Sequence, residues 1–371
     1  MKKKYIIFSI VTLVLLVSFL SYSKYLKTTN VCKEDVKPTK ITKGISMNLE
    51  QTAGAGDYKQ VTQSSWPTEG YEFNAELSKC ENGSTLSWDD TKKAIIVSGN
   101  LSDKCYVYFD IWIPPSIAEY VKSQYTGTQG DNALYYHNST LTNGAGDNSY
   151  RYAGASDSVN NYICLGSDKA TCPDANLFRI IGVFGDQTKV IRAKSVGDQK
   201  WHTSDSNTWS SSSLNTYLNG TYLTSLGTLA DKIATTTWKV GGESSTYLYD
   251  VPTTAYQYEV GSSASTTTYE AKIGLMYASD YGFAASSSAW TTKLSSYSSN
   301  TSKNWLYLGS YEWTISRNSG TATDAFDVTS TGSVNYCTVT AGFAARPSFN
   351  LESSVKYVSG SGSMSDPVRV N

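Results

Sequence analysis

One hydrophobic run near the start of the chain, residues 5–20 (YIIFSIVTLVLLVSFL), constrains the protein more than any other feature. Lysines occupy positions 2–4 just before it, and no comparable run follows. An apolar segment of about 16–20 residues can cross a bilayer as a helix, because a helix satisfies its own backbone polar groups. The lysines are expected to stay in the cytoplasm, which exports the rest of the chain. We therefore expect residues 1–23 to form a cytoplasmic tip and a transmembrane anchor.

A cleaved signal peptide is the alternative interpretation of this segment. The lysines and the apolar run suit both, but the site after the run is a poor cleavage site. Ser21-Tyr22-Ser23 gives a small-x-small pattern without alanine, and Lys24 follows at once. We carry the anchor forward, which makes the protein a single-pass protein of the cell membrane with the bulk of the chain extracellular.

The composition argues against a nucleic-acid partner. Charged residues make up only 17% of the chain and the net charge is −1, so there is no basic field to attract phosphates. The chain instead carries 28 tyrosines and 9 tryptophans in segments rich in Ser, Thr, Asn and Gly. Aromatic and threonine-rich segments broken by Gly and Asn favour strands and turns over helix.

Cysteines in an exported chain are expected to form disulfides. The six cysteines are Cys32, Cys80, Cys105, Cys164, Cys172 and Cys337. Two pairs are close in sequence, which predicts a Cys80–Cys105 bridge and a Cys164–Cys172 bridge. Cys32 and Cys337 are left without an assigned partner. The sequence has no CxxC motif and no other metal-ligand spacing, so we expect no metal site and no cofactor.

Composition shifts along the chain predict four segments after the anchor. Residues 24–50 are rich in Lys and Thr and are expected to form a stalk. Residues 51–115 show short strand-like runs between Asx and Gly turns, which is typical of a small antiparallel β-sandwich. Residues 116–161 have the composition of a connector. Residues 162–371 form the last module, and every arginine of the chain lies at or after Arg151.

The predicted elements are short and mixed. Residues 116–125 suit a short amphipathic helix, and residues 177–184 (LFRIIGVF) with residues 189–193 (KVIRA) suit a β-hairpin. Residues 214–223 place apolar side chains at i, i+4 and i+8 after a serine that can act as an N-cap. The expected fold class is α+β: a transmembrane helix, a small antiparallel β domain, and a C-terminal module with short strands, one or two helices and long loops.

The serial order of motifs in the last module resembles a known family. The motifs are LFRIIGVF, WSSSSLNTYLNGTYLTSL, KIGLMYASDYGFA, NWLYLGSYEWTISR, GFAARPSFNL and a closing SGSGSMSDPVRV. They resemble exported, functionally uncharacterised surface proteins of Gram-positive gut bacteria, over roughly Tyr162 to the C-terminus. The C-terminal module of that family is similar to the C-type-lectin and formylglycine-generating-enzyme-like fold, so the resemblance implies a lectin-like module here.

The resemblance carries few functional residues across. The calcium-dependent lectin motifs Glu-Pro-Asn or Gln-Pro-Asp, followed by Trp-Asn-Asp, are absent, and the cysteine pair of the formylglycine-generating enzymes is reduced to Cys337. Arg346-Pro347 matches the family's Gly-Phe-x-x-Arg-Pro stretch. We expect Arg346, between Phe343 and Phe349, to be structural and to bind carbonyls or a carboxylate.

Catalytic motifs are also absent from the sequence. The chain has two histidines, His137 and His202, and His202 lies near Asp205 without a Gly-x-Ser-x-Gly elbow. Asp205-Ser206-Asn207 begins like a calcium loop but lacks the later ligands. Four glutamates are candidate glycosidase carboxylates that no motif ranks: Glu243, Glu259, Glu270 and Glu312. We therefore expect a protein that is not an enzyme.

These observations together predict an adhesin-like surface protein whose C-terminal module binds a glycan, a cell-wall polymer or a protein. Aromatic side chains in loops rich in Gly, Ser and Asn make adaptable contacts. The predicted ligand-binding residues, expected to line a shallow surface patch, are Trp201, Trp209, Trp290, Trp305 and Trp313. The alternatives are a cell-envelope hydrolase and a structural subunit of a surface assembly.

Overall fold

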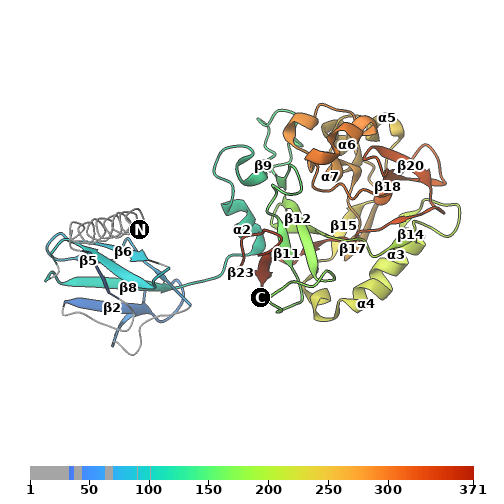
Figure 1. Ribbon diagram of the computed structural model, residues 1–371. Coiled ribbons are helices and arrows are strands. Elements are labelled where there is room, and N and C mark those ends of the chain that lie inside the picture. The colour runs from blue at the N-terminus through green and yellow to red at the C-terminus, as the bar shows by residue number, and fades with distance from the viewer. Residues whose placement is uncertain (1–32, 37–43, 63–69, 90, 101) are drawn as a thin grey trace, which may run out of the picture. The chain divides into compact units, whose positions relative to one another are not determined.

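The computed structural model of the protein describes residues 33–36, 44–62, 70–89, 91–100 and 102–371. The chain divides into two compact units, Met1–Ile113 and Pro114–Asn371. Both helices and strands are present, which confirms the α+β class (Figure 1). The predicted anchor at residues 1–23 lies outside the described residues. Across the described ranges, the structure contains no helix with the length and hydrophobicity needed to span a membrane.

The described part of the first unit consists of two small sheets. One has the order β3-β2-β8-β4, with β5 also paired to β8, and the other has the order β1-β7-β6. The strands are β1 (Lys33–Val36), β2 (Ile45–Glu50), β3 (Tyr58–Val61), β4 (Tyr71–Phe73), β5 (Lys79–Cys80), β6 (Thr85–Asp89), β7 (Ala94–Ser98) and β8 (Cys105–Ile111). Inward-facing side chains of both sheets, such as Met47, Ile95 and Phe109, form one buried cluster.

This unit differs from the prediction in two respects. The stalk predicted for residues 24–50 is wrong for β1 and β2, because both are paired strands and β2 buries Met47 and Leu49. The unit is also not purely antiparallel, since β2 pairs with β8 in parallel register from Ile45↔Cys105 to Leu49↔Phe109. The lysine- and threonine-rich composition of residues 24–50 therefore did not predict the strand β2, because β2 buries few apolar side chains.

The second unit is built on a nine-stranded sheet. Its main path is β17-β22-β13-β12-β11-β24-β23, and β10 joins through β12 and carries β9. A five-stranded sheet has the order β14-β21-β18-β19-β20, and β15 pairs with β16. The strands are β9 (Leu134–Tyr136), β10 (Tyr150–Tyr152), β11 (Tyr162–Cys164), β12 (Leu177–Phe184), β13 (Gln187–Arg192), β14 (Asp198–Lys200), β15 (Thr236–Lys239), β16 (Thr268–Ala271), β17 (Ile273–Gly274), β18 (Glu312–Arg317), β19 (Asp324–Val328), β20 (Val334–Thr338), β21 (Gly342–Ala344), β22 (Ser348–Leu351), β23 (Tyr357–Ser359) and β24 (Val368–Val370).

Short helices connect these strands. They are α2 (Ile117–Ser123), η2 (Asp131–Ala133), η3 (Trp209–Ser211), α3 (Ser213–Tyr217), η4 (Leu218–Tyr222), α4 (Leu223–Ser225), η5 (Gly227–Lys232), α5 (Ser245–Leu248), α6 (Pro252–Glu259), α7 (Ala278–Phe283), η6 (Ser287–Ala289) and η7 (Leu294–Lys303). Both helices named in the prediction are present. α2 begins with a capping box between Ser116 and Glu119, and α3 begins at the N-cap Ser212, whose hydroxyl accepts from the N–H of Asn215.

The segment predicted as a connector, residues 116–161, is an integral part of the second unit. It supplies α2, β9 and β10, and β10 pairs with β12 through Arg151↔Gly182. A Cβ at Gly182 would lie 2.2 Å from the carbonyl oxygen of Tyr150, so only glycine allows β10 to approach this closely. In the same segment, Tyr120 of α2 stacks on Tyr357 of β23, and the two elements lie side by side (Figure 1).

Both predicted disulfides are confirmed. Cys80 is bonded to Cys105 in the first unit, and Cys164 is bonded to Cys172 in the second. Cys337 is a free, half-buried thiol on β20, and Cys32 lies outside the described residues.

Candidate ligand-binding site

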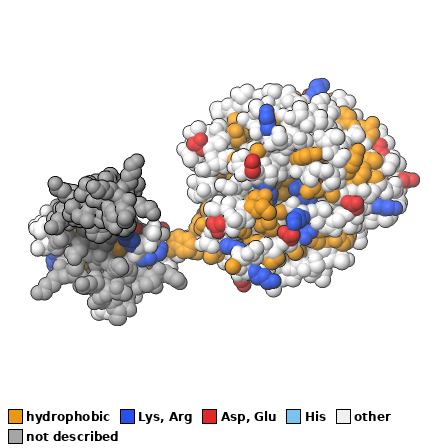
Figure 2. All heavy atoms as spheres, viewed as in Figure 1, with side chains coloured by type: hydrophobic (Ala, Val, Ile, Leu, Met, Phe, Trp, Pro, Cys, Tyr) orange, Lys and Arg blue, Asp and Glu red, His pale blue; other side chains and the backbone are white. Residues whose placement is uncertain are grey.

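A cavity of about 210 Å³ in the second unit combines aromatic and charged side chains. It is bordered by β10, the β12–β13 hairpin, β15, α6, the start of α7 and β22. The lining residues are Asp147, Arg151, Phe184, Lys189, Thr236, Thr237, Trp238, Lys239, Tyr256, Val260, Tyr277, Ser279, Asp280 and Asn350. Thr237 on β15 is exposed, so the cavity reaches solvent beside this strand. On the face shown in Figure 2, charged side chains of this unit are scattered among uncharged ones.

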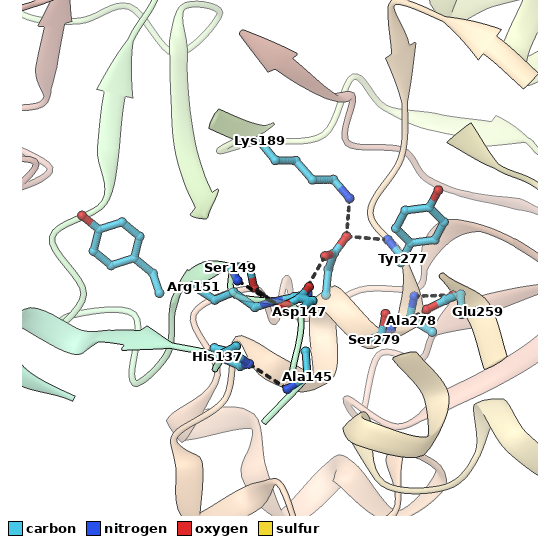
Figure 3. A network of polar contacts seen from close by, with 12 residues as sticks. His137, Ala145, Asp147, Ser149, Arg151, Lys189, Glu259, Tyr277, Ala278 and Ser279 are labelled. Carbon is cyan, nitrogen blue, oxygen red and sulfur yellow. Dashed lines mark hydrogen bonds and ion pairs between the residues drawn. The ribbon is translucent and has the colours of Figure 1, made fainter. Parts of the chain in front are cut away.

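The centre of the site is a buried ion pair between β13 and α7. Lys189 is 5% exposed and Asp280 is 3% exposed, and the Lys189 Nζ lies 2.6 Å from the Asp280 Oδ2. The backbone N–H of Tyr277 donates to the same oxygen at 2.9 Å (Figure 3). Burial lowers the pKa of Lys189, and the neighbouring Asp280 carboxylate opposes that shift.

A second buried cation extends the network. Arg151 on β10 donates from NH2 to the Asp147 Oδ2 at 2.6 Å and from Nε to the Ser149 hydroxyl at 2.8 Å. Its NH1 lies 3.6 Å from the Asp280 Oδ1. Burial alone would raise the pKa of Asp147, but Arg151 and the hydrogen bonds from Ser149 outweigh it and lower the pKa to about 2. Two cations and two carboxylates thus form one connected network of balanced charge.

Aromatic rings surround both cations. The Arg151 guanidinium lies 4.6 Å from the ring centre of Phe184 and 5.1 Å from that of Tyr256. The Lys189 ammonium lies 4.4 Å from the ring of Tyr277, with the rings of Trp238 and Phe184 at 5.3 and 5.9 Å. Cation–π contacts of this kind offset part of the cost of removing the cations from water. The aromatic rings around the cavity therefore contact the protein's own cations.

Glu259 stabilises the backbone at the start of α7, next to the cavity. Its carboxylate accepts the backbone N–H groups of Ala278 and Ser279, both at 2.9 Å, and the hydroxyl of Ser316 (Figure 3). Burial raises the pKa of Glu259, and these hydrogen bonds oppose the shift. Glu259 thereby fixes the first turn of α7, which carries Asp280. Of the four glutamates that no motif could rank, this one lies next to the cavity.

One buried polar atom at the cavity has no partner within the described part of the chain. It is the Oδ1 of Asn350, a residue that is 7% exposed. The hydroxyl of Ser279, a residue that is 1% exposed, lies beside the Glu259 carboxylate and opposes the rise of its pKa. Asn350 and Ser279 both line the cavity. Buried polar atoms in native proteins are nearly always hydrogen-bonded, so an unpartnered one at a cavity indicates where a ligand or water is held.

The predicted tryptophan patch is wrong, because none of the five side chains is exposed. Their exposed fractions lie between 0% and 2%. Four of the indole N–H groups donate to backbone carbonyls: Trp201 to Thr314, Trp290 to Ala285, Trp305 to Tyr152 and Trp313 to Gln199. Trp209 is packed against Trp201. The tryptophan that borders the cavity is Trp238, which the sequence-based expectation missed.

Arg346 has the kinds of partner expected from the sequence. Its guanidinium donates to both carboxylate oxygens of Glu312 and to the carbonyl of Leu306, and the residue is buried. Pro347 follows it, and its carbonyl accepts the N–H of Arg192. Neither residue lines the cavity, and Glu312 is occupied by this pair.

The two histidines take different places. His137 is buried, its Nδ1 accepts the N–H of Ala145, and burial together with the nearby Arg151 charge lowers its pKa well below the usual value. His202 is half-buried, and its ring accepts from the N–H of Thr203. Neither histidine lines the cavity. Within the described residues, no cluster of three or more His, Cys, Asp and Glu side chains could hold a metal ion.

Part of the second unit matches a known family of protein domains. Residues 185–353 match a domain of unknown function (DUF6273). The matched region contains Lys189, Lys239, Asp280 and Asn350, whereas Arg151 lies outside it. No curated protein matches the chain, and no solved structure matches it.

Proposed function

We propose that the second unit is a lectin-like ligand-binding module and that its cavity takes one sugar residue of a glycan. One observation carries the proposal: a charge-balanced, buried network borders a cavity that is also lined by the Ser279 hydroxyl and by the unpartnered Oδ1 of Asn350. Sugar hydroxyls donate and accept hydrogen bonds at once. They can therefore donate to Asn350 and accept from the cations of the network.

The size and walls of the cavity agree with a ligand of this class. Pockets for drug-sized ligands span about 300–1,000 Å³, so a cavity of about 210 Å³ suits a single ring. Val260 and the aromatic side chains give it apolar walls beside the polar floor. A sugar ring has the same division, with C–H groups on its faces and hydroxyls at its edge.

For the whole chain we propose a membrane-anchored surface protein that presents this module outside the cell. The two disulfides support export, because disulfides persist in oxidising compartments. The test is fractionation of cells followed by protease treatment. The chain should stay with membranes and be digested from outside. Recovery of a soluble mature form that begins near Lys24 would contradict the anchor.

A hydrolase is the second candidate, because Asp147 and Asp280 border the same cavity. Glycoside hydrolysis needs one carboxylic acid whose pKa is raised so that it can protonate the leaving group. Asp147 has its pKa lowered to about 2 by Arg151 and Ser149, so it is held ionised. The pairing with Arg151 and Lys189 therefore favours binding over acid catalysis.

A glycan array probed with the full-length protein in detergent micelles tests the binding proposal. Ser279→Ala should weaken binding about fivefold, since a hydrogen bond contributes about 1 kcal/mol. The matched control is Ser298→Ala, at an exposed serine that does not line the cavity, and it should bind like the unmodified protein. An array without any positive glycan, or equal binding by both variants, would contradict the proposal.

A further inference from the structure

Lys239 differs from the other cations of the cavity. It is the last residue of β15, it is half-buried, and it lines the cavity. Its backbone N–H donates to the Tyr277 hydroxyl at 2.9 Å, and the Tyr277 ring faces Lys189 at 4.4 Å. The backbone of Lys239 is thus fixed to the site. Among the described residues, its ammonium has no carboxylate within the 4.0 Å of an ion pair.

The charges that line the cavity do not balance once Lys239 is included. The cations are Arg151, Lys189 and Lys239, and the carboxylates are Asp147 and Asp280. Arg151 and Lys189 are compensated by the two carboxylates at 2.6 Å. One positive charge, that of Lys239, is left over at the side of the cavity that reaches solvent.

The titratable groups packed behind the lining do not compensate it. Glu259 is not part of the lining, its carboxylate is directed at the N–H groups of Ala278 and Ser279, and burial raises its pKa toward the neutral form. His137 is not part of the lining, and burial together with the Arg151 charge lowers its pKa. The excess positive charge therefore faces the cavity and any ligand in it.

We infer that the sugar bound in this cavity carries a carboxylate, and that Lys239 is the residue that selects it. The inference rests on the proposed glycan-binding function and narrows its ligand class. The ring hydroxyls would contact Asn350 and Ser279, and the carboxylate would contact the Lys239 ammonium. Charge-assisted hydrogen bonds are roughly twice as strong as neutral ones, so the acid should be preferred over its neutral counterpart.

Three kinds of sugar share this chemistry: hexuronic acids, sugars with a lactyl ether such as N-acetylmuramic acid, and nonulosonic acids such as N-acetylneuraminic acid. Titration calorimetry with the full-length protein can distinguish them. The ligand pairs are galacturonate and galactose, glucuronate and glucose, and N-acetylmuramate and N-acetylglucosamine, with N-acetylneuraminate as a single acid. At least one acid should bind about tenfold more tightly than its neutral partner or, for N-acetylneuraminate, than any neutral sugar tested. The acid that binds most tightly identifies which of the three kinds of sugar is the ligand.

Variants at Lys239 separate the inference from the proposed function. Lys239→Gln should abolish the preference for the acid over the neutral sugar, and Lys239→Arg should keep that preference. Lys293→Gln, at a lysine outside the cavity, is the matched control and should change neither affinity. Raising the salt concentration should reduce the difference in affinity between the acid and the neutral sugar.

Each outcome has a distinct meaning. Equal binding of acid and neutral sugar, or tighter binding of the neutral one, would overturn the inference while the proposed function stands. An acid preference that survives in Lys239→Gln would overturn the role of Lys239. No binding of any sugar, together with a negative glycan array, would overturn the proposed function and this inference with it.

Discussion

Lys189 and Asp280 are separated by 91 residues in the sequence and form an ion pair of 2.6 Å that is almost completely buried. The pair joins β13 in the centre of the large sheet to the first turn of α7. Because Asp280 also accepts the N–H of Tyr277, one carboxylate fixes the helix start, the lysine and the floor of the cavity.

This pair predicts an asymmetric response to substitution. Asp280→Asn leaves Lys189 buried without a charged partner, and removal of one partner of a buried pair costs about 3–5 kcal/mol of unfolding free energy. Lys189→Met should cost less, because Asp280 keeps Arg151 at 3.6 Å. Urea unfolding of both single variants and the double variant should give a coupling energy of about 1.5–3 kcal/mol.

The exposed pair Lys194–Asp174 is the matched control for this double-mutant cycle. Its ion pair is 2.5 Å long, but the two side chains are 61% and 63% exposed. Exposed pairs are screened by water and contribute less than about 1 kcal/mol. Equal coupling energies for the two pairs would show that burial does not determine the strength of the Lys189–Asp280 pair.

A second prediction concerns the glycine that lets β10 reach the sheet. Gly182→Ala should cost about 2–3 kcal/mol, because its Cβ would meet the Tyr150 carbonyl oxygen and push the strand away. The displacement of Arg151 should also weaken glycan binding. Gly185→Ala is the control: its φ is 63° and its Cβ would meet open space, so backbone strain of about 1–2 kcal/mol should be its whole effect. Unchanged ligand affinity in Gly182→Ala would contradict this role.

Features that are local in sequence were predictable. The strand β12 (Leu177–Phe184) is a continuous apolar run, α2 begins with a capping signal, and both disulfides join cysteines that are close in the chain. In each of these cases the side chains that determine the structure lie within about 25 residues of one another. Physical rules for short-range patterns therefore apply to them directly.

The cavity could not be predicted, because segments that lie far apart in the sequence assemble it. Lys189 illustrates the difficulty: consecutive residues from Thr188 to Ile191 are buried, so both faces of β13 are covered and its lysine gives no alternation signal. The prediction of an exposed tryptophan patch failed for another reason. The sequence neighbours of these tryptophans are polar, but four of the five indole N–H groups donate to backbone carbonyls, and all five side chains are buried. Polar neighbours in sequence are thus no measure of exposure.

The two disulfides should differ in their contribution to stability. The Cys80–Cys105 bridge spans 25 residues and the Cys164–Cys172 bridge spans 8. In the chain-entropy account the bridge that closes the longer loop stabilises more, by about 3.5 kcal/mol against about 2.5 kcal/mol. Cys80→Ser/Cys105→Ser should therefore lower the unfolding free energy more than Cys164→Ser/Cys172→Ser, as followed by thermal unfolding. Peptide mapping without reduction checks the pairing, and free thiols at all four positions would contradict both bridges.

An unpaired carboxyl group lies in β19, away from the cavity. Asp327 is 1% exposed, and neither of its carboxylate oxygens has a hydrogen-bond partner among the described residues. Burial raises the pKa of Asp327 from the ordinary value of 3.8 to about 7. The folded protein therefore holds this proton across a range of pH in which the unfolded chain has released it.

This difference predicts that the protein loses stability as the pH rises from about 4 to about 7. In that window the folded state binds more protons than the unfolded state, so the unfolding free energy falls with rising pH and levels off above it. A shift of this size corresponds to roughly 4 kcal/mol. Asp327→Asn keeps a neutral side chain of the same shape. Its urea midpoint should match that of the unmodified protein near pH 3.5 and exceed it at pH 8. Asp186→Asn, at a 92% exposed side chain, should leave the pH dependence as it is. The same pH dependence in Asp327→Asn and in the unmodified protein would assign the effect to another group.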